Sequence, residues 1–312
     1  MQEVVMVLGA PASGKSSYSD ELISKGYIHL NRDKEGGTVI DLLPKMKVLL
    51  SSGKNIVLDN LFAKEESRKP FIEAAQSANI SIRCVWVKTS IEDSIINALH
   101  RMWNRYQKIF FHPNDLKGIK DPNMFPIAVF FKYKKEFEKP STAEGFSKVE
   151  TKEFTRIYDS SYTNKAAIFD YDGTLRIVKN GEFEFPVKTC EVELLPNRIE
   201  KLFELKKQGY ILLGASNQSG VAKGDLSLED AKSCFEQTNK LLKQDIDYVF
   251  CPHSVPPVCY CRKPQSGLGV YLTNKYKLDP RKCLYVGDQT TDKTFATRLG
   301  FEYFDATKFF EG

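Results

Sequence analysis

The stretch GAPASGKS, residues 9–16, follows the apolar run VVMVLG (residues 4–9) and precedes a sequence that can form a helix. It fits the pattern G-x-x-x-x-G-K-[ST] in the strand, loop and helix context that this pattern requires. In such a loop the backbone N–H groups surround nucleotide phosphates, the lysine reaches the β- and γ-phosphates, and the hydroxyl holds Mg²⁺. We therefore predict ATP binding here, with Mg²⁺ on the hydroxyl of the last residue. The predicted ATP-binding residues are Gly9, Ala10, Pro11, Ala12, Ser13, Gly14, Lys15 and Ser16.

Apolar runs alternate with stretches of helical periodicity along the rest of the chain. The later runs that end in polar turns are NIVLDN (55–60), AAIFDYDG (166–173), YILLGASNQ (210–218), YVFCPH (248–253) and CLYVGDQ (283–289). Alternation at this spacing predicts βαβ units around parallel sheets. We therefore predict an α/β protein of two domains, each a parallel sheet flanked by helices: a P-loop fold over residues 1–157 and a second sheet domain over residues 158–312. The boundary, near residue 158, lies in a segment that contains Pro, Gly, Ser and Thr and only short apolar runs, residues 137–165.

The composition excludes several classes of protein. With 42% hydrophobic, 12% aromatic and 27% charged residues, the 312-residue chain can bury two cores and is neither disordered nor fibrous. No stretch approaches the ~18 apolar residues that cross a membrane, so we expect no membrane association. The seven cysteines are an odd number, and three crowd into residues 251–261, which is not the spacing of a disulfide framework. This favours an intracellular, reducing compartment: the cytoplasm, or the nucleus in a eukaryote.

The net charge of +5 comes from residues 1–157, and residues 101–150 hold ten basic and six acidic residues. This excess fits a surface that meets nucleic-acid phosphates, and it fits equally a solvated helix in KYKKEFEK, residues 132–139. Arg101 and Arg105 lie four residues apart, hence on one face of a helix. Such a pair can close over the phosphates of ATP or remain a solvated surface.

Two further strand ends in the first domain carry candidate acceptor-site residues. Asp33 follows the apolar run YIHL (residues 27–30). It can either cap a helix or take a proton from an acceptor hydroxyl, while the neighbouring Arg32 can bind a phosphate of the acceptor. The pair Asp59-Asn60 offers a capping or metal-positioning group with the same ambiguity.

In the second domain, Asp170 and Asp172 end an apolar run and are separated by one residue. Since successive strand residues point to opposite faces, both carboxylates can face one cavity at the strand end, where Gly173 permits the turn. One carboxylate can attack phosphorus, while the other protonates the leaving oxygen and later activates water. A D-x-D-G turn also fits a calcium loop or a simple hairpin.

Three later strand ends favour the catalytic interpretation of this turn. Ser216-Asn217 offers a hydroxyl and an amide for phosphate oxygens, Lys263 offers a cation, and Asp288, with Asp292 close by, offers a metal carboxylate.

In this order the four strand ends resemble the haloacid dehalogenase superfamily of phosphatases. The resemblance implies a Rossmann-like fold in which Asp170 is the nucleophile, Asp172 the general acid and base, and Lys263 a further catalytic residue. It implies that Mg²⁺ is held by Asp170, the Asp172 carbonyl and Asp288, and that phosphate is bound by Thr174, Ser216 and Asn217. The segments between these motifs are short, so we expect no large cap domain.

Four soft metal ligands lie within eleven residues as C-x-H-x₅-C-x-C: Cys251, His253, Cys259 and Cys261. Three thiolates and one imidazole meet the tetrahedral demand of structural Zn²⁺, and the site would fix the loop that carries Lys263. Free buried cysteines are the alternative interpretation. The remaining residues Cys84, Cys190, Cys234 and Cys283 lie on or beside apolar runs or helices and are most simply packing residues.

Residues 1–157 resemble the kinase domain of polynucleotide kinase/phosphatases. The resemblance is carried by GAPASGKS, HLNRD, IVLDN, ESRKPFIEAAQSANISIRC and the distal KKEFEKPSTAEGFSKV. It implies that Asp33 activates the 5′-hydroxyl of a nucleic-acid end. The cysteine and histidine cluster instead resembles that of heptose-bisphosphate and histidinol-phosphate phosphatases, a branch that acts on small metabolites.

The leading hypothesis is nucleic-acid end healing, in which ATP phosphorylates a 5′-hydroxyl and a 3′-phosphate is removed through an aspartyl-phosphate. Nucleic-acid ends, DNA or RNA, would be the substrate, and ligase or repair proteins possible partners. The alternative is a small-molecule kinase joined to a sugar-phosphate phosphatase. A nucleic-acid-binding protein without catalysis is disfavoured because Lys15, Asp33, Asp170, Lys263 and Asp288 are all present.

Overall fold

The computed structural model describes residues 2–180, 182–256 and 258–311, which divide into two compact units. The first unit holds residues 2–98 and 120–156, and the second holds residues 99–119 and the described residues from 157 onward. The sequence assigns residues 99–119 to the first domain, and here the structure differs. Their aromatic side chains explain the difference, because Trp103 and Phe111 both pack on Tyr271 of the second unit, with ring centroids 5.8 and 6.2 Å apart.

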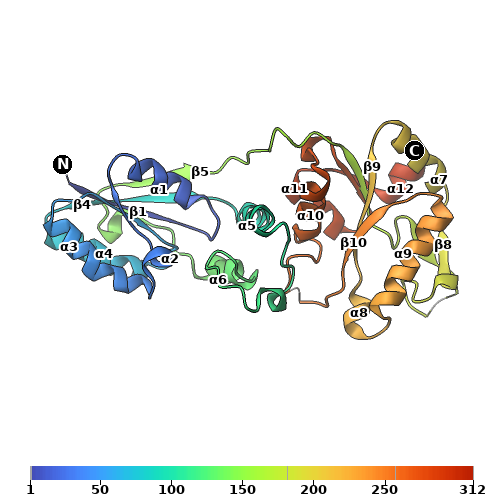
Figure 1. Ribbon diagram of the computed structural model, residues 1–312, viewed down its shortest axis with the longest axis horizontal. Coiled ribbons are helices and arrows are strands. Elements are labelled where there is room, and N and C mark those ends of the chain that lie inside the picture. Colours follow the sequence, from blue (N-terminus) through green and yellow to red (C-terminus); the bar gives the residue numbers. More distant parts are fainter. Residues whose placement is uncertain (1, 181, 257, 312) are drawn as a thin grey trace. The chain divides into compact units, whose positions relative to one another are not determined.

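The first unit is built on a parallel sheet in the order β2-β3-β1-β4-β5 (Figure 1). Its strands are β1 (Glu3–Gly9), β2 (Ile28–Leu30), β3 (Ile56–Asp59), β4 (Ser81–Lys88) and β5 (Val149–Glu153). Its helices are α1 (Lys15–Ile23), α2 (Arg32–Glu35), η1 (Val39–Asp41), α3 (Leu42–Ser51), α4 (Glu65–Ser77), α6 (Ala128–Glu136) and η3 (Thr142–Glu144). Helix α5 (Ile91–Tyr106) begins in this unit and passes into the second after Ala98, followed there by η2 (Pro113–Leu116).

Both faces of β1 are buried, because alternate residues of the strand face different helices. Val4, Met6 and Leu8 pack into a core that includes residues of α3 and α4. Val5 and Val7 pack into a second core with Leu22 of α1. A strand covered on both faces reads as a continuous apolar run, which is why VVMVLG marks the centre of the sheet.

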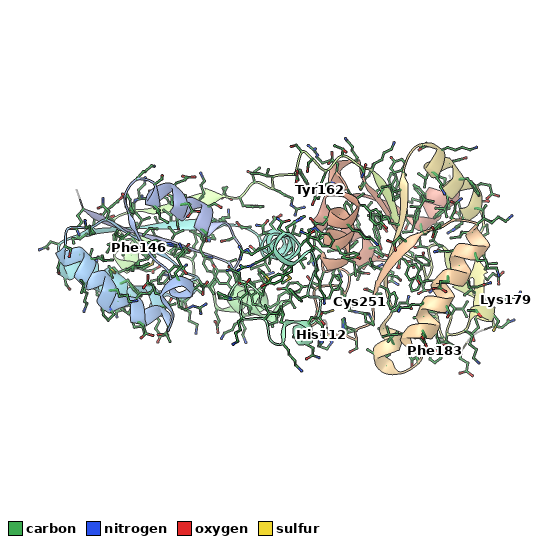
Figure 2. The ribbon with its side chains drawn as sticks, in the orientation of Figure 1. His112, Phe146, Tyr162, Lys179, Phe183 and Cys251 are labelled. Carbon is green, nitrogen blue, oxygen red and sulfur yellow. The ribbon has the colours of Figure 1, made fainter. Side chains whose placement is uncertain are left out.

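The segment assigned to the interdomain boundary contains structure that the sequence did not predict. Strand β5 adds to the edge of the sheet beside β4, and its polar sequence VETKE carries no apolar alternation. Phe146, just before it, is buried in the core with α3 and α4 (Figure 2). Arg68 of α4 forms a buried ion pair with Glu144, at 2.6 Å between Nε and Oε2. The distal segment is therefore an integral part of the first unit.

The second unit has a parallel sheet in the order β10-β9-β6-β11-β12. Its strands are β6 (Ala166–Phe169), β9 (Ile211–Asn217), β10 (Asp247–Cys251), β11 (Leu284–Gly287) and β12 (Glu302–Asp305). Its helices are η4 (Thr189–Glu191), α7 (Arg198–Lys207), α8 (Ser219–Lys223), α9 (Leu228–Leu242), α10 (Gly267–Tyr276), η5 (Pro280–Lys282), α11 (Thr290–Leu299) and α12 (Ala306–Glu311). One face packs on α7, α9 and α12, and α10 and α11 lie on the other (Figure 1).

Strands β7 (Arg176–Val178) and β8 (Val192–Leu194) form a small antiparallel pair in the chain between β6 and α7. The 3-10 helix η4 (Thr189–Glu191) lies between these two strands along the chain. Both units have the parallel α/β architecture that the sequence predicts.

No helix among the described residues is both long and apolar enough to cross a membrane.

Candidate active sites

Residues outside the loop between β1 and α1 fix its conformation by hydrogen bonds to its carbonyls. Ala12 and Gly14 adopt positive φ values of 54° and 95°, which turn the backbone toward the start of α1. Thr89 Oγ1 donates to the Ser13 carbonyl at 2.8 Å, and Asn97 Nδ2 donates to the Ala12 carbonyl at 3.0 Å. The backbone N–H groups at this helix start are therefore arranged for an anion, as in a phosphate-binding loop.

Lys15 and Ser16 occupy the first turn of α1, directly after this loop. The Lys15 ammonium lies over the loop and donates to the carbonyls of Gly9 at 3.1 Å and Ala10 at 2.7 Å. Ser16 Oγ lies 3.4 Å from Oδ2 of Asp59, at the end of β3. A hydroxyl beside a carboxylate is the arrangement that holds Mg²⁺ in P-loop nucleotide sites.

Asp59 is almost fully buried, and its surroundings favour the metal-positioning interpretation over simple capping. Its carboxylate lies 3.4 Å from Nε2 of His29 on β2, in addition to Ser16. Its backbone carbonyl accepts a 2.6 Å hydrogen bond from Asn31 Nδ2. The neighbouring Asn60 accepts from the Arg32 backbone N–H at 3.3 Å. These bonds tie the ends of β2 and β3 together.

Asp33 lies in the first turn of α2, and the alternative that it caps the helix is wrong. Asn31 is the capping residue, since its side-chain oxygen accepts from the Asp33 backbone N–H at 2.8 Å. The Asp33 carboxylate instead pairs with the guanidinium of Arg32. Both side chains are exposed, at 37% and 46%, so the carboxylate is open to an incoming hydroxyl.

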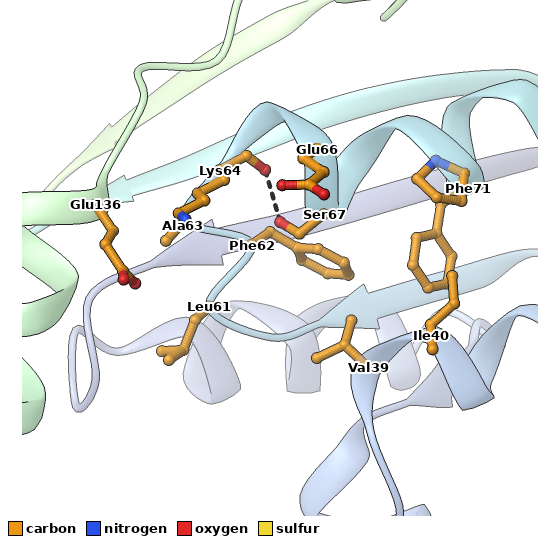
Figure 3. A pocket seen from close by; sticks show the side chains of 11 residues that line it. Val39, Ile40, Leu61, Phe62, Ala63, Lys64, Glu66, Ser67, Phe71 and Glu136 are labelled. Carbon is orange, nitrogen blue, oxygen red and sulfur yellow. Dashed lines mark hydrogen bonds between the residues drawn. The ribbon is translucent and has the colours of Figure 1, made fainter.

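A cavity of about 440 Å³ opens beside this region of the first unit (Figure 3). Its walls come from η1, the segment between β3 and α4, the start of α4 and the end of α6, and they include Val39, Ile40, Leu61, Phe62, Pro70 and Glu136. Leu61 follows Asp59 and Asn60 directly, and η1 follows α2. One wall of the cavity therefore begins at Leu61, one residue after the Asp59-Asn60 pair, while Arg32 and Asp33 do not line it.

Arg101 and Arg105 lie on α5 beyond Ala98, where the helix belongs to the second unit. Their predicted contact with the phosphates of ATP stays a prediction.

In the second unit, Asp170 follows the last residue of β6 and is buried. Its Oδ1 accepts from the Tyr171 backbone N–H at 2.8 Å and lies 3.1 Å from the Lys263 ammonium. Burial raises the pKa of the Asp170 carboxyl above its ordinary value, and the positive charge of Lys263 opposes that rise.

Lys263 pairs with two carboxylates of this site, Asp170 and Asp292. Its ammonium lies 2.7 Å from Asp292 Oδ1 and donates to the Tyr285 hydroxyl at 2.8 Å. Its backbone is clamped by Asn217, whose side chain donates to the Lys263 carbonyl at 3.1 Å and accepts from its N–H at 3.0 Å. Desolvation lowers the pKa of Lys263, but Asp170 and Asp292 outweigh it and hold the net pKa above its ordinary value. The side chain therefore stays a cation inside the site.

Asp288 lies at the end of β11, and the turn at Gly173 brings it close. Gly173 has φ 77°, and a Cβ added there would overlap the Asp288 carboxylate. Thr174 Oγ1 lies 3.4 Å from Asp288 Oδ1. Carboxylate oxygens of Asp170, Asp288 and Asp292 lie within 4.8 Å of one another, and carboxylates are the ligands that Mg²⁺ prefers. The site thus fits a magnesium ion.

The Asp172 carboxylate accepts hydrogen bonds from two side chains, Arg176 and Gln218. Arg176 Nε donates to its Oδ1 at 2.7 Å, and Gln218 Nε2 donates to its Oδ2 at 2.6 Å. Gln218 also donates to Ser216 Oγ at 3.2 Å. Arg176 is buried and donates in turn to Thr238 Oγ1 at 3.0 Å. The carboxylate is therefore fixed in place by neighbours that are themselves fixed.

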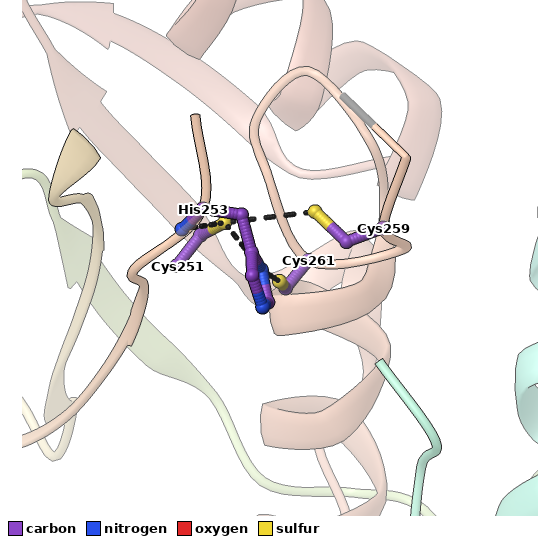
Figure 4. A group of neighbouring side chains, drawn as sticks. All are labelled: Cys251, His253, Cys259 and Cys261. Carbon is purple, nitrogen blue, oxygen red and sulfur yellow. Dashed lines mark hydrogen bonds between the residues drawn. The ribbon is translucent and has the colours of Figure 1, made fainter. Parts of the chain in front are cut away.

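The four soft ligands converge as the sequence predicts (Figure 4). The sulfurs of Cys251 and Cys259 lie 3.7 Å apart, and Nδ1 of His253 lies 3.4 Å from the Cys251 sulfur and 3.2 Å from that of Cys261. A Zn²⁺ that binds sulfur at about 2.3 Å separates two tetrahedral thiolates by about 3.8 Å. The spacing therefore fits Zn²⁺, and all four are within 4.8 Å of one another.

Of the other cysteines, Cys84, Cys234 and Cys283 are buried, as expected of packing residues. Cys190 is exposed on η4, so the packing interpretation is wrong for it.

Cys261→Ser is expected to reduce bound zinc from about one ion per chain to a small fraction, because a tetrahedral structural site loses one of its four bonds. We expect the melting temperature of the second unit to fall by roughly 5 °C or more, since metal binding contributes to folding. Metal analysis and thermal unfolding measure both. Cys190→Ser, on an exposed thiol, is the matched control. Equal zinc content in the two variants would contradict the site.

Several residues of these sites carried no role in the sequence interpretation. They are His29, Asn31, Arg176, Gln218 and Tyr285. Two had a local signal: Gln218 directly follows Asn217 at the strand end, and Arg176 lies four residues after Asp172. Asn31 lies two residues before Asp33, while His29 and Tyr285 meet partners far along the chain.

Two family models match the chain. The model described as polynucleotide kinase 3 phosphatase matches residues 165–310, and one described as AAA domain matches residues 4–105. A D-glycero-β-D-manno-heptose-1,7-bisphosphate 7-phosphatase of Haemophilus influenzae is 34% identical over 139 residues, 41% of this chain and 73% of that enzyme. The second unit belongs to the polynucleotide kinase 3 phosphatase family. We call it the phosphatase unit below, and the first unit the P-loop unit.

Two further matches concern proteins with two activities or a repair role. A bifunctional polynucleotide phosphatase/kinase of Schizosaccharomyces pombe is 30% identical over 165 residues, 51% of this chain but only 35% of that protein. A solved structure of the Pnkp1/Rnl/Hen1 RNA repair complex covers 97% of this chain and 95% of its own, at 16% identity and a TM-score of 0.33. A TM-score this low assigns neither fold nor function.

Proposed function

We propose that the chain heals nucleic-acid ends. The P-loop unit would transfer the γ-phosphate of ATP to a 5′-hydroxyl, and the phosphatase unit would remove a 3′-phosphate. The observation that carries this proposal is the presence, in one chain, of a phosphate loop with an open carboxylate at Asp33 and a unit of the polynucleotide kinase 3 phosphatase family. The two reactions act on the two sides of one break and leave ends that a ligase can join.

In the kinase step, the Asp33 carboxylate takes the proton of the acceptor hydroxyl as its oxygen attacks the γ-phosphorus, and ADP leaves. Lys15 would move from its carbonyl partners to the phosphate oxygens. Ser16 and Asp59 would hold Mg²⁺, which when bound neutralises charge on the phosphates. Arg32, paired with Asp33, would bind a phosphate of the acceptor.

The cavity beside Asp59 and Asn60 suits the base of the terminal acceptor nucleotide. Its volume lies in the range of about 300–1,000 Å³ typical of ligand sites, and Ile40 and Leu61 line it while remaining partly exposed. Apolar and aromatic walls bind bases without regard to sequence, since every base has a flat apolar face.

Leu61→Glu is expected to raise the KM for a 5′-hydroxyl oligonucleotide about tenfold, because it places a negative charge in the cavity and removes contact with the base. The KM for ATP should stay within about twofold. Steady-state kinetics with each substrate varied in turn measures both. Val48→Glu, at an exposed apolar position on α3 outside the cavity, is the control. An unchanged KM for the oligonucleotide would place the acceptor elsewhere.

In the phosphatase step, an oxygen of Asp170 attacks phosphorus and the bond to the leaving 3′-oxygen breaks, with Asp172 giving that oxygen its proton. Water then gives a proton to Asp172 and attacks the aspartyl-phosphate, which releases phosphate and restores Asp170. Lys263, with Thr174, Ser216 and Asn217, would hold the phosphate oxygens. Asp170 and Asp288 would hold Mg²⁺, which when bound stabilises negative charge on the transferred phosphoryl group, with Asp292 beside them and the Asp172 carbonyl as a further ligand.

The test uses a single labelled oligonucleotide with a 5′-hydroxyl and a 3′-phosphate, incubated with ATP and Mg²⁺. Mass spectrometry then determines whether each end carries a phosphate. Gain of one phosphate at the 5′ end and loss of one at the 3′ end is the expected result. Gain without loss would remove the 3′-phosphatase part of the proposal. No change at either end would remove the proposal as a whole.

A second candidate for the phosphatase unit is a small sugar bisphosphate. The observation behind it is the 34% identity to a heptose-bisphosphate phosphatase, together with the cluster of three cysteines and one histidine, whose sequence resembles that branch. Hydrolysis of such a bisphosphate with no release of phosphate from 3′-phosphate oligonucleotides would favour it.

Healed ends are substrates for ligation, so ligase or other repair proteins are the partners that this function needs. The three clustered thiols require a reducing compartment to stay available to zinc.

A further inference from the structure

The zinc loop of the phosphatase unit is contacted by a segment that precedes the unit in sequence. Residues 99–119 lie between elements of the P-loop unit along the chain but belong to the phosphatase unit in space. The Tyr260 backbone N–H donates to the Phe111 carbonyl at 2.8 Å. The ring of His112 stacks on the ring of His253, with centroids 4.7 Å apart and planes 20° apart.

The ring of His112 is itself held in a fixed position. His112 caps η2: its Nδ1 accepts from the Asn114 backbone N–H at 3.2 Å, and its own N–H donates to Asp115 Oδ2 at 2.9 Å. Further along the same segment, Trp103 and Phe111 pack on Tyr271 of α10. The segment is thus anchored to the unit at several points, and the His112 ring presents a rigid flat surface to His253.

The contacted loop leads directly to the catalytic lysine. Tyr260 lies between the ligands Cys259 and Cys261, and Lys263 follows two residues after the second of them. Lys263 reaches Asp170 at 3.1 Å. One residue, Arg262, lies between the last zinc ligand and Lys263, and its Nη1 donates to the His253 carbonyl at 2.9 Å. A shift of His253 would therefore be passed to the lysine through few bonds.

We propose that His112 is a positioning residue for the phosphatase: its ring holds the zinc ligand His253 in place, and so fixes the zinc and the loop that carries Lys263. The proposal rests on the proposed zinc site and phosphatase activity. Groups that orient metal ligands typically change metal affinity by about 10- to 100-fold when removed. Residues 99–119 thereby make the phosphatase unit depend on a segment from the first half of the chain.

Two variants of the full-length chain separate the ring from the helix cap. His112→Asn keeps a side-chain acceptor for the Asn114 N–H and removes the ring, whereas His112→Phe keeps a ring and removes the acceptor. Lys117→Ala, at an exposed side chain of the same segment, is the control. Zinc release is followed with a chromogenic chelator, and kcat and KM are measured on p-nitrophenyl phosphate with Mg²⁺.

His112→Asn is expected to release zinc at least about tenfold faster and to lower phosphatase kcat several-fold with little change in KM. His112→Phe and Lys117→Ala should behave like the unmodified chain, and kinase activity should be unchanged in all three. Unchanged zinc release in His112→Asn, or a defect in His112→Phe alone, would overturn the proposal. Faster zinc release in a chain that does not act on 3′-phosphate ends would leave this inference standing and remove only the proposed substrate.

Discussion

Asp170→Asn is expected to lower phosphatase activity by about 10⁴-fold or more, because the amide cannot attack phosphorus to form the covalent intermediate. Kinase activity should stay within about twofold, since Asp33 and the phosphate loop belong to a different unit. The buried Lys263 ammonium keeps a carboxylate partner in Asp292 at 2.7 Å, so the variant should still fold. Release of phosphate from a 3′-phosphate oligonucleotide and transfer from labelled ATP measure the two activities.

Asp245→Asn, at an exposed carboxylate of the same unit, is the control for this substitution. A thermal melt separates loss of chemistry from loss of fold. Residual phosphatase activity above about one hundredth of the unmodified rate would show that Asp170 is not the nucleophile. A loss of kinase activity in the same variant would contradict the independence of the two sites.

Asp33→Asn is expected to lower kinase activity by about 10²- to 10⁴-fold, which is the usual contribution of a general base. The effect should fall on kcat, while the KM for ATP stays near its original value, because Lys15 and the loop backbone bind the phosphates. Phosphatase activity should be unchanged. The Asp33 side chain is partly exposed and pairs with its exposed neighbour Arg32, so the free energy of unfolding should change by no more than about 0.5 kcal/mol.

Glu35→Gln is the matched control, since Glu35 is an acidic residue on the same short helix that pairs with Lys45. Kinase activity retained in Asp33→Asn would move the base elsewhere, and the buried Asp59 would be the next carboxylate to replace. Loss of both the kinase and the phosphatase activity from this one change would contradict the assignment of two separate sites.

The sequence determined those features whose chemistry is contained in a few consecutive residues. The loop from Gly9 to Ser16, the turn from Asp170 to Gly173 and the ligand set from Cys251 to Cys261 each carry their donors, turns and glycines within one short segment. Local backbone geometry then suffices to place the groups: the Lys15 ammonium lies over its own loop, and the four ligands of the last segment lie within 4.8 Å of one another. The alternation of apolar runs likewise predicted both parallel sheets, because strands buried on both faces are continuously apolar.

Only the tertiary structure decided which distant residues complete the sites. Asp292 meets Lys263, Gln218 meets Asp172, and Asp59 meets Ser16 because the order and register of the sheet strands bring their carboxyl ends to one edge. The edge strand β5 is polar, so no local pattern marks it. Residues 99–119 pack on the zinc loop through aromatic contacts, and charge and spacing along the chain carry no information about such contacts. Packing between segments far apart in sequence is a property of the whole fold, and for that reason it could not be read from any one stretch of the chain.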